Sequence, residues 1–286
     1  AARLAVFVVG RYAMHRNAAF HQNVGQERRA AQIAQWTYEE AFARNLGLID
    51  RDEQERLRNS RVAIAGMGGI GGLNAVTLAR LGVGNFTIAD PDAFEVANTN
   101  RQYGAMASTM GQPKATVMRD VLRDINPEAD VRVFTDPVGR ENVVDFLRDA
   151  DLFIDAVDFF AMDVRRLLFR EAARRGIYSI TGGPVGFSGV WIVFSPTGMS
   201  FDEYFDLHQT TPELDQIVAF GVGVAPKATQ RSYMDLSKLD PQARKAPCSS
   251  VGCQIAAGGI GTEAIKILLA KKRIRVAPCY NQFDPF

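Results

Sequence analysis

The stretch RVAIAGMGGIGG, residues 61–72, decides the fold of this 286-residue chain. Four apolar residues, Val62 to Ala65, form the kind of short run that makes a buried strand, and Gly66 ends it. Apolar residues then recur at helical spacing over residues 73–81, until Gly82 ends the pattern. The stretch therefore predicts a strand, a glycine-rich turn and a helix, which begin a βαβ unit.

The same alternation continues along the chain and predicts an α/β fold. A strand over 189–194 follows the preceding strand too closely for a crossover helix, so we expect it to be antiparallel after a turn formed by Gly182, Gly183 and Gly186. Further strands are expected at 85–89, 131–134, 152–156 and 177–180, and helices at 113–125, 142–147, 163–175 and 251–270. The pattern predicts a doubly wound, mostly parallel Rossmann-like sheet with antiparallel C-terminal strands.

Composition excludes several functional classes. Thirty-three Lys and Arg against 32 Asp and Glu give a net charge of +1, so no overall field attracts nucleic acid or a membrane. The first apolar run, Leu4 to Val9, is too short for a signal segment or a membrane span, and cytoplasm is the expected location. Three cysteines without a CxxC pair predict neither a disulfide framework nor a structural metal.

The glycines after the first strand lie where a nucleotide-binding turn needs them. Such glycines let the backbone approach a phosphate, and the helix that follows offers free N–H groups to an anion. The expected phosphate-binding residues are Gly66, Gly68, Gly69 and Gly71. Asp90 ends the second expected strand, where an acid that holds an adenosine ribose is expected. NAD and ATP fit these features equally, and a tight turn without a ligand is the plain alternative.

Polar residues just beyond Asp90 favour ATP. Asp92, Asn98, Arg101 and Lys114 follow it within 24 residues of sequence in the motifs DPD, NTNRQ and GQPK. Backbone N–H groups suffice for the pyrophosphate of NAD, whereas reaction at the α-phosphate of ATP needs fixed positive groups on the leaving pyrophosphate. Taken singly, each cation also fits a solvated surface charge, but the order of the motifs favours a triphosphate site.

Five segments in this order resemble the adenylyltransferases typified by ThiF and MoeB, relatives of the ubiquitin-activating enzymes. They are RVAIAGMGGIGG, IADPDAFEVANTNRQ, GQPKA, DINPE and DLFIDAVD, and the similarity resumes over residues 248–269. The resemblance implies a homodimeric enzyme that uses ATP and Mg²⁺ to adenylate a carboxylate. The acceptor would be the C-terminal glycine of a ubiquitin-like protein, a peptide or a small acid, and pyrophosphate would be released.

The resemblance also assigns roles to individual residues. Asp90 would bind the ribose and Asp158 would hold Mg²⁺, with Asp155 the less favoured candidate. The nucleotide-contacting set would be Gly66, Gly68, Gly69, Gly71, Asp90, Asp92, Asn98, Arg101 and Lys114. The catalytic set would be Arg101, Lys114, Asp158, Arg44 and Cys248.

Two of these catalytic candidates have a plain alternative. Arg44 resembles the family arginine that crosses the dimer interface to the partner's phosphates, and otherwise it is a helix-surface charge. Cys248 precedes an expected helix, at a position where some relatives use a cysteine for thioester or persulfide chemistry, and otherwise it is a small packing residue. Cys253 lies inside the helix and is expected to pack.

The chain departs from the family in the region that shapes the acceptor site. It lacks the two CxxC pairs usual there, and residues 197–247 show no clear period, with Asp202 expected on a solvated loop. The expected organisation is an N-terminal helical segment at the dimer interface (1–58), an ATP-binding domain (59–196), an insert over the acceptor site (197–247) and a closing helix and strand (248–286). The 286 residues also fit one module of a longer protein.

Two other functional classes stay open. An NAD(P)-dependent oxidoreductase shares the glycine turn and Asp90, but it leaves Arg101, Lys114 and Asp158 without a role. A non-catalytic nucleotide-binding protein is suggested by the missing CxxC pairs. We expect an adenylyltransferase with no nucleic-acid or membrane partner.

Overall fold

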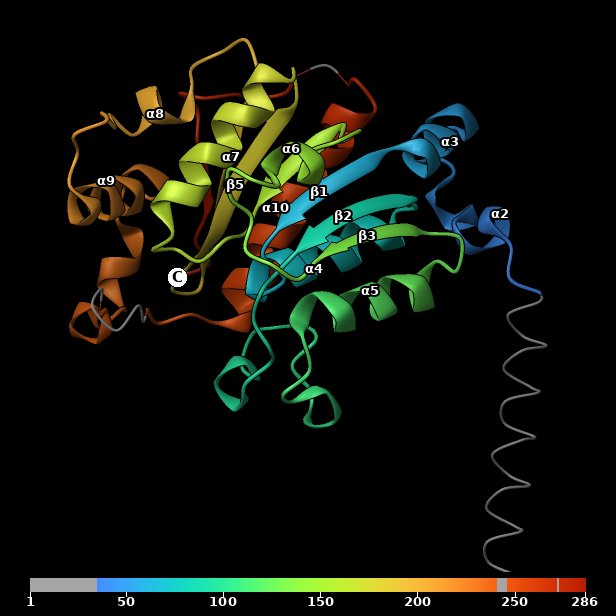
Figure 1. Ribbon diagram of the computed structural model, residues 1–286, viewed down its shortest axis with the longest axis horizontal. Coiled ribbons are helices and arrows are strands. Elements are labelled where there is room, and N and C mark those ends of the chain that lie inside the picture. Colours follow the sequence, from blue (N-terminus) through green and yellow to red (C-terminus); the bar gives the residue numbers. More distant parts are fainter. Residues whose placement is uncertain (1–34, 241–245, 272) are drawn as a thin grey trace, which may run out of the picture. The chain divides into compact units, whose positions relative to one another are not determined.

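The computed structural model describes residues 35–240, 246–271 and 273–286 (Figure 1). Its contacts divide the chain into two units, residues 1–44 and 45–286, which we describe separately. Residues 1–34 of the expected N-terminal helical segment lie outside the described part. In the first unit, α2 (Tyr38–Ala41) is capped by Thr37, whose side chain accepts a hydrogen bond from the Glu40 N–H.

The second unit is built on a seven-stranded sheet with the order β3-β2-β1-β4-β5-β6-β7 (Figure 1). The strands are β1 (Arg61–Ala65), β2 (Asn85–Ala89), β3 (Asp130–Phe134), β4 (Leu152–Asp155), β5 (Tyr178–Val185), β6 (Ser188–Phe194) and β7 (Asn281–Phe283). Strands β1 to β5 pair in parallel, whereas β6 pairs antiparallel with both β5 and β7. The expected mostly parallel sheet with antiparallel C-terminal strands is confirmed.

Helices cover both faces of this sheet. Because side chains alternate along a strand, Val62 and Ile64 of β1 face one cluster of buried residues while Ala63 and Ala65 face the other. The first cluster includes residues of α4 (Gly69–Arg80), α5 (Lys114–Ile125) and α10 (Ser250–Leu268), and the second those of α6 (Val143–Phe146) and α7 (Met162–Arg174). In the described part of the chain, no helix combines the length and apolarity needed to cross a membrane.

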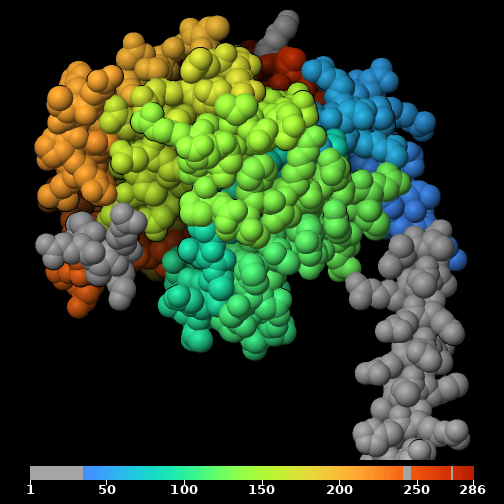
Figure 2. Space-filling model, in the orientation of Figure 1, coloured from blue at the N-terminus to red at the C-terminus, as the bar shows by residue number. Residues whose placement is uncertain are grey.

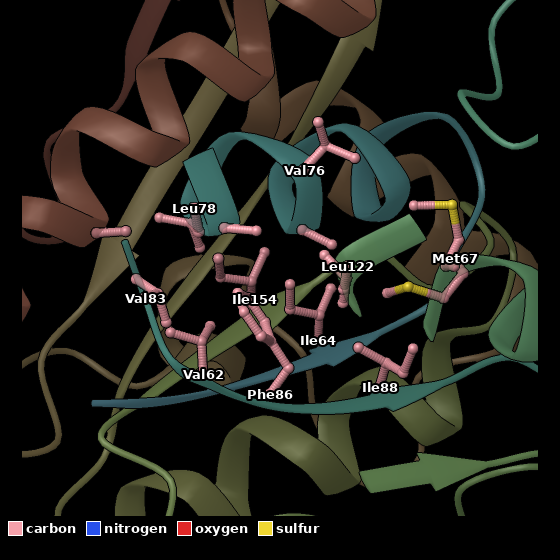
Figure 3. Packing of buried hydrophobic residues seen from close by; sticks show 14 of the residues in the cluster. Val62, Ile64, Met67, Val76, Leu78, Val83, Phe86, Ile88, Leu122 and Ile154 are labelled. Atoms are coloured by element: carbon pink, nitrogen blue, oxygen red, sulfur yellow. The ribbon is translucent and has the colours of Figure 1, made fainter. Parts of the chain in front are cut away.

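The core under α4 fixes the strands that carry the candidate site. Figure 3 shows Ile64, Phe86, Ile88 and Ile154 of β1, β2 and β4 gathered beneath α4, together with Leu78. All five side chains are fully buried, and burial of each stabilises the fold by about 1.5–3 kcal/mol. The ends of the three strands are therefore held in one rigid arrangement.

The structure differs from the expected turn before β6. Gly182 and Gly183 lie within β5, which extends to Val185, and only Gly186 turns the chain, with φ +65°. A side chain at Gly182 would lie 2.4 Å from the Val190 carbonyl oxygen of β6, so the glycine allows close strand pairing.

The insert over residues 197–247 contains helices that the sequence pattern concealed. They are α8 (Phe201–Tyr204) and α9 (Glu213–Val224). Outside the insert, α3 (Arg51–Asn59) precedes β1. Two glycines interrupt the apolar pattern of α9, because Gly221 and Gly223 pack beneath aromatic rings. The expectation that Asp202 is a solvated loop acid is wrong: Asp202 lies in α8 and accepts hydrogen bonds from Arg166 at 2.8 and 3.0 Å.

Candidate functional site

The candidate site forms at the carboxyl ends of β1, β2 and β4. The strand order runs from β1 toward β2 on one side and toward β4 on the other, and open α/β sheets bind ligands at such a switch point. Gly66 follows β1 with φ +94°, and a Cβ there would lie 2.1 Å from the Ala156 carbonyl oxygen. A Cβ at Gly71 would lie 1.7 Å from the Gly66 oxygen. These two glycines keep the turn tight against the loop after β4.

The amino terminus of α4 faces this turn. The helix starts at Gly69 after its N-cap Gly68, and no side chain among the described residues caps it. The first N–H groups of a helix lack intrahelical partners and favour an anion. The expected phosphate-binding turn is therefore formed by backbone rather than by side chains.

Asp90 is the buried acid of the site. It follows β2, is 6% exposed, and accepts hydrogen bonds from the Met67 N–H at 2.7 Å and the Asp92 N–H at 2.9 Å. Burial raises the pKa of the Asp90 carboxyl above its usual value, although the charge of Lys114 and the two N–H groups act in the opposite direction. The carboxylate thus braces the glycine turn through Met67.

Lys114 brings a buried cation to the same place. It begins α5, is 7% exposed, and its Nζ lies 3.0 Å from Oδ2 of Asp92. Its backbone N–H also donates to the Asp92 carbonyl oxygen at 2.9 Å. Because a buried ammonium needs an anionic partner, Asp92 orients Lys114, and this gives Asp92 a positioning role beside the expected nucleotide contact.

Residues 90–113 connect β2 to α5 and carry the other expected contacts. Figure 2 shows part of this segment, in teal and green, projecting at the lower edge of the view. The side chain of Asn98 accepts from the Glu95 N–H at 2.9 Å, so it shapes the local turn. Arg101 is half-buried, and Nη1 donates to the Ala97 carbonyl oxygen and to Asn100 Oδ1 at 3.1 and 2.9 Å. Its Cγ would lie 3.5 Å from a Cβ at Gly69, next to the start of α4.

Gln102 is a polar residue of the site that sequence reasoning did not single out. It is buried, its Nε2 lies 3.5 Å from the position of a Cβ at Gly68, and its Oε1 has no hydrogen-bond partner among the described residues. Its place directly after Arg101 in the NTNRQ motif was the available signal.

The two acids near the end of β4 have different environments. Asp155 is fully buried and accepts hydrogen bonds from Arg165 Nε at 2.7 Å and from Thr181 Oγ1 at 2.6 Å, so its charge is already neutralised. Asp158 is exposed, and its Oδ1 accepts from the Phe160 N–H at 2.9 Å. Asp158 is therefore the acid of this loop that is open to an added cation.

The described residues include no group of three or more His, Cys, Asp or Glu side chains that could hold a metal ion by themselves. Mg²⁺ that travels with a nucleotide needs only one or two protein carboxylates, because the phosphates supply the other oxygens. The exposed carboxylate of Asp158, two residues after Ala156, which touches the glycine turn, fits such a metal.

Two cysteines meet beside the glycine turn. Cys248 Sγ lies 3.7 Å from Cys253 Sγ, and Cys253 is fully buried in α10, as expected. A Cβ at Gly69 would lie 3.0 Å from Cys253 Sγ. The Cys248 carbonyl oxygen accepts a hydrogen bond from Asn100 Nδ2 at 3.0 Å, 148 residues earlier in the chain. The second thiol near the turn was not expected from the sequence.

The environment makes the two thiols unequal. The hydrogen bond from Cys253 lowers the pKa of Cys248, and the charge of Arg101 and the N–H of Ser249 add to this effect against the cost of burial. The same hydrogen bond and burial raise the pKa of Cys253. Cys248 is therefore the thiol that ionises first.

Replacement of Cys253 by alanine should slow alkylation of Cys248. The variant removes the donor that stabilises the Cys248 thiolate, so its pKa rises and the thiolate fraction near neutral pH falls, by about 10-fold for one pKa unit. Iodoacetamide labelling followed by peptide mass spectrometry measures this rate, with the exposed Cys279 as an internal control. Equal labelling of Cys248 in both proteins would contradict the assigned donor.

Arg44 belongs to the first unit. It is exposed and lies in the short 3₁₀ helix Ala43–Asn45. Its expected role at a partner's phosphates stays a prediction.

A model of the ThiF family matches residues 42–286. The chain belongs to the ThiF family. This confirms the resemblance that the five motifs indicated.

Several members of the ThiF family are similar to this chain in sequence. The tRNA threonylcarbamoyladenosine dehydratase of Bacillus subtilis (strain 168) is 38% identical over 139 residues, covering 48% of this chain and 53% of that protein. The probable adenylyltransferase/sulfurtransferase MoeZ of Mycobacterium tuberculosis H37Rv is 31% identical over 232 residues, covering 79% and 53%. Molybdopterin-synthase adenylyltransferase of Escherichia coli K12 is 33% identical over 147 residues, covering 51% and 58%. The chain spans about half the length of these relatives.

Solved structures show the same fold. PaaA aligns with a TM-score of 0.64 at 21% identity over 86% of this chain and 70% of that one. E. coli tRNA N6-threonylcarbamoyladenosine dehydratase, TcdA, in complex with ATP aligns with a TM-score of 0.58 at 23% identity over 81% and 95%. Two of the three sequence relatives above are named adenylyltransferases, and TcdA has been solved with ATP.

Proposed function

We propose that this chain is an adenylyltransferase that transfers AMP from ATP to a carboxylate and releases pyrophosphate. One observation carries the proposal: a glycine turn, a buried acid and a buried cation meet at one edge of the sheet. Asp90 lies against the turn through the Met67 N–H, and Lys114 lies beside Asp92 at the same strand end. A dinucleotide would use the turn and the acid, but backbone N–H groups suffice for its pyrophosphate, whereas reaction at the α-phosphate of ATP needs a fixed cation such as Lys114 on the leaving pyrophosphate.

Each residue has a separable task in this reaction. The glycine turn and the α4 amino terminus would hold phosphate oxygens, and Asp90 would accept the ribose hydroxyls. An oxygen of the acceptor carboxylate attacks the α-phosphorus, and the bond from that phosphorus to the bridging oxygen breaks. Pyrophosphate leaves with the electron pair, and Lys114 and Arg101 would neutralise its charge. The product is a mixed anhydride of the acceptor and AMP.

A divalent cation would add charge neutralisation on the phosphates. Asp158 is the residue proposed to hold Mg²⁺, because it is exposed while its neighbour Asp155 is already paired with Arg165. Asn98 is proposed to contact the triphosphate from the segment that also carries Arg101. The protein contributes mainly positioning, since phosphoryl-type transfers need little covalent help from side chains.

Cys248 is proposed to capture the activated acceptor. Its thiolate would attack the acyl carbonyl of the mixed anhydride, the sulfur–carbon bond would form, and AMP would leave with the electrons of the broken carbon–oxygen bond. The lowered pKa of the Cys248 thiol and its place beside Arg101 support this step. An acceptor adduct on Cys248 that hydroxylamine releases would identify the thioester.

Acceptor-dependent exchange of radioactive pyrophosphate into ATP tests the proposal. The panel contains proteins ending in Gly-Gly, peptides and small carboxylic acids, which are the acceptor classes proposed here. Because a relative is named for a modified tRNA nucleoside, tRNA belongs to the panel as well. Exchange with one acceptor class supports the proposal. If no acceptor supports exchange and the protein binds NADH more tightly than ATP, the NAD(P)-dependent oxidoreductase would replace this proposal.

ATP affinity should fall at acidic pH through Asp90. Its carboxyl has a raised pKa, so on acidification it takes up a proton at higher pH than an ordinary aspartate and stops accepting the ribose hydroxyls. At neutral pH, ATP should bind about 10- to 100-fold more tightly than 2′,3′-dideoxy-ATP, as expected for hydrogen bonds to a charged group. Calorimetry across pH measures the ratio, which should shrink on acidification in the wild type. A ratio that is the same at every pH would argue against Asp90 as the ribose acceptor.

Arg44 is proposed to complete the site of a second copy in a homodimer. Dimerisation, like a cytoplasmic location, stays a prediction. If Arg44 acts in trans, mixing inactive Arg44→Ala and Lys114→Met chains forms mixed dimers in which one of the two sites is intact. Subunit exchange at equal amounts should then restore about a quarter of wild-type exchange activity. Mixtures that stay inactive after exchange would show that Arg44 does not serve the partner.

A further inference from the structure

Arg165 is a buried arginine that the proposed reaction has not used. It lies on α7 and is only 2% exposed. Its Nε donates to Asp155 at 2.7 Å, which accounts for its charge. Neutralising one carboxylate does not require the remaining four N–H groups of the guanidinium, so their partners indicate what else the residue does.

Three consecutive backbone carbonyls accept from these remaining groups. Nη2 donates to the oxygens of Val157 at 2.9 Å and Asp158 at 3.1 Å, and Nη1 donates to the oxygen of Phe159 at 3.2 Å. Nη1 also lies 3.5 Å from Met162 Sδ. The planar, rigid arrangement of arginine donors fixes the directions of these carbonyls in a way that a lysine ammonium does not. Arg165 thus determines the path of the loop after β4.

That loop contacts the glycine turn of the candidate nucleotide site through Ala156 and also carries Asp158. Its first residue, Ala156, lies so close to Gly66 that a Cβ there would meet the Ala156 oxygen at 2.1 Å. Asp158, two residues later, presents the exposed carboxylate proposed to hold Mg²⁺. Asp158 is one of the three residues whose carbonyls Arg165 holds, so a shift of these residues would move the proposed metal ligand.

A helix of the insert packs over the same guanidinium. The Arg165 Cζ lies 4.3 Å from the centroid of the Phe220 ring on α9. The Phe220 ring also lies 5.4 Å from the Phe159 ring, and Gly221 lies beneath that ring, since a Cβ there would be 3.3 Å from Phe159 Cζ. This contact joins the insert to the loop, and cation–π contacts of desolvated arginines are favourable.

We propose that Arg165 is a positioning residue for nucleotide binding. It acts through the carbonyls of residues 157–159 to hold Asp158 at the phosphates, and Phe220 of the insert holds Arg165 in turn. The inference rests on the proposed function and deepens it, because it links the segment over the acceptor side to the metal ligand of the nucleotide site.

A double-mutant cycle on Mg²⁺·ATP affinity tests the proposal. Arg165→Lys keeps the positive charge but loses the planar set of guanidinium N–H donors. The variant should bind Mg²⁺·ATP about 10- to 100-fold more weakly, as for other residues that orient a metal ligand. Asp158→Asn should have a similar effect. Because both act through one ligand, the double variant should bind within about two-fold of Asp158→Asn alone. If Arg165 had a purely structural role, the fold-losses in Mg²⁺·ATP affinity of the two single variants would multiply in the double variant.

Arg166→Lys is the matched control. Arg166 is the next residue of α7 and is also buried, but its guanidinium binds Asp202 of α8 and Gln216 of α9 instead of the loop. It should bind Mg²⁺·ATP within about two-fold of wild type, because lysine keeps the charge beside Asp202 and the Arg166 guanidinium makes no contact with residues 157–159. An equal loss in Arg166→Lys, a wild-type affinity in Arg165→Lys, or multiplying effects in the cycle would each overturn the inference.

A second variant covers the case in which Arg165→Lys does not fold, as judged by its thermal melting. Phe220→Leu keeps an apolar side chain on α9 and removes the ring over the guanidinium. It should weaken Mg²⁺·ATP binding by about three-fold, and again without adding to Asp158→Asn. Additive effects of Phe220→Leu would overturn the inference. Failure of the wild type to bind Mg²⁺·ATP would instead overturn the proposed function.

Discussion

Replacement of Lys114 by methionine is expected to lower kcat for ATP–pyrophosphate exchange by about 100- to 1,000-fold, the usual effect of removing one preorganised group that stabilises developing charge. Lys114 is buried, and its Nζ pairs with Asp92 at 3.0 Å. Methionine keeps an unbranched apolar stem of similar length, so α5 should keep its packing. The loss comes from the missing positive charge, which leaves Asp90 and Asp92 to repel the phosphates.

Lys227→Met is the control for Lys114→Met. Lys227 is exposed, so the same substitution removes a solvated charge and should leave exchange unchanged. Any difference in melting temperature between the two variants should reflect only the loss of the ion pair between buried Lys114 and exposed Asp92. Exchange in Lys114→Met that matches Lys227→Met would show that the buried cation does not act on the leaving pyrophosphate.

Replacement of Gly71 by alanine is the second change with a large expected effect. The added methyl would lie 1.7 Å from the Gly66 carbonyl oxygen and 3.1 Å from the Ala156 Cβ, so the turn must open. Overpacking of this kind costs about 1–3 kcal/mol in the free energy of unfolding. Because the turn itself forms the phosphate contacts, ATP affinity should fall by at least about 100-fold. Urea unfolding and calorimetric ATP titration measure the two effects.

Gly72→Ala is the matched control for Gly71→Ala. At Gly72 the same methyl would lie 3.4 Å from its nearest neighbour, the Met67 carbonyl oxygen, which is an ordinary contact. Alanine also favours a helix over glycine by about 1 kcal/mol. Gly72→Ala should therefore keep both stability and ATP binding. Similar losses in the two variants would mean that the start of α4 tolerates no alanine, for a reason other than closeness to Gly66.

The parallel half of the fold could be predicted because its signals are local. The run Val62 to Ala65 is buried on both faces, as expected for a parallel strand between helices. The helices α4, α5 and α7 each end near a glycine or an asparagine that stops them. The candidate contacts of the site were predicted by motif order. These residues lie at one edge of the sheet because β1, β2 and β4 pair in parallel, so the carboxyl ends of the three strands lie together.

The remaining features depend on contacts that a linear pattern does not carry. Residues 197–247 fit either a loop with short helices or a flexible cover, and the pattern did not locate α9, because Gly221 and Gly223, which weaken helical periodicity, lie against the rings of Phe159 and Phe205. Arg165 resembles any charge on an amphipathic helix until Asp155 is seen beside it. The pairing of Cys248 with Cys253 depends on how the chain enters α10 at its N-cap Ser249, and not on a recognisable spacing.

The contact between Asn100 and the Cys248 carbonyl has a consequence for the order in which the protein matures. The two residues are 148 positions apart in the chain. Five residues after Cys248, Cys253 packs against Gly69 at the start of α4. Contacts between such distant residues form late, because loop closure must be completed first. The ribosome releases the nucleotide turn long before it releases α10. A nascent chain that ends before residue 248 would therefore contain every expected phosphate ligand but would lack α10, whose Cys253 packs against Gly69.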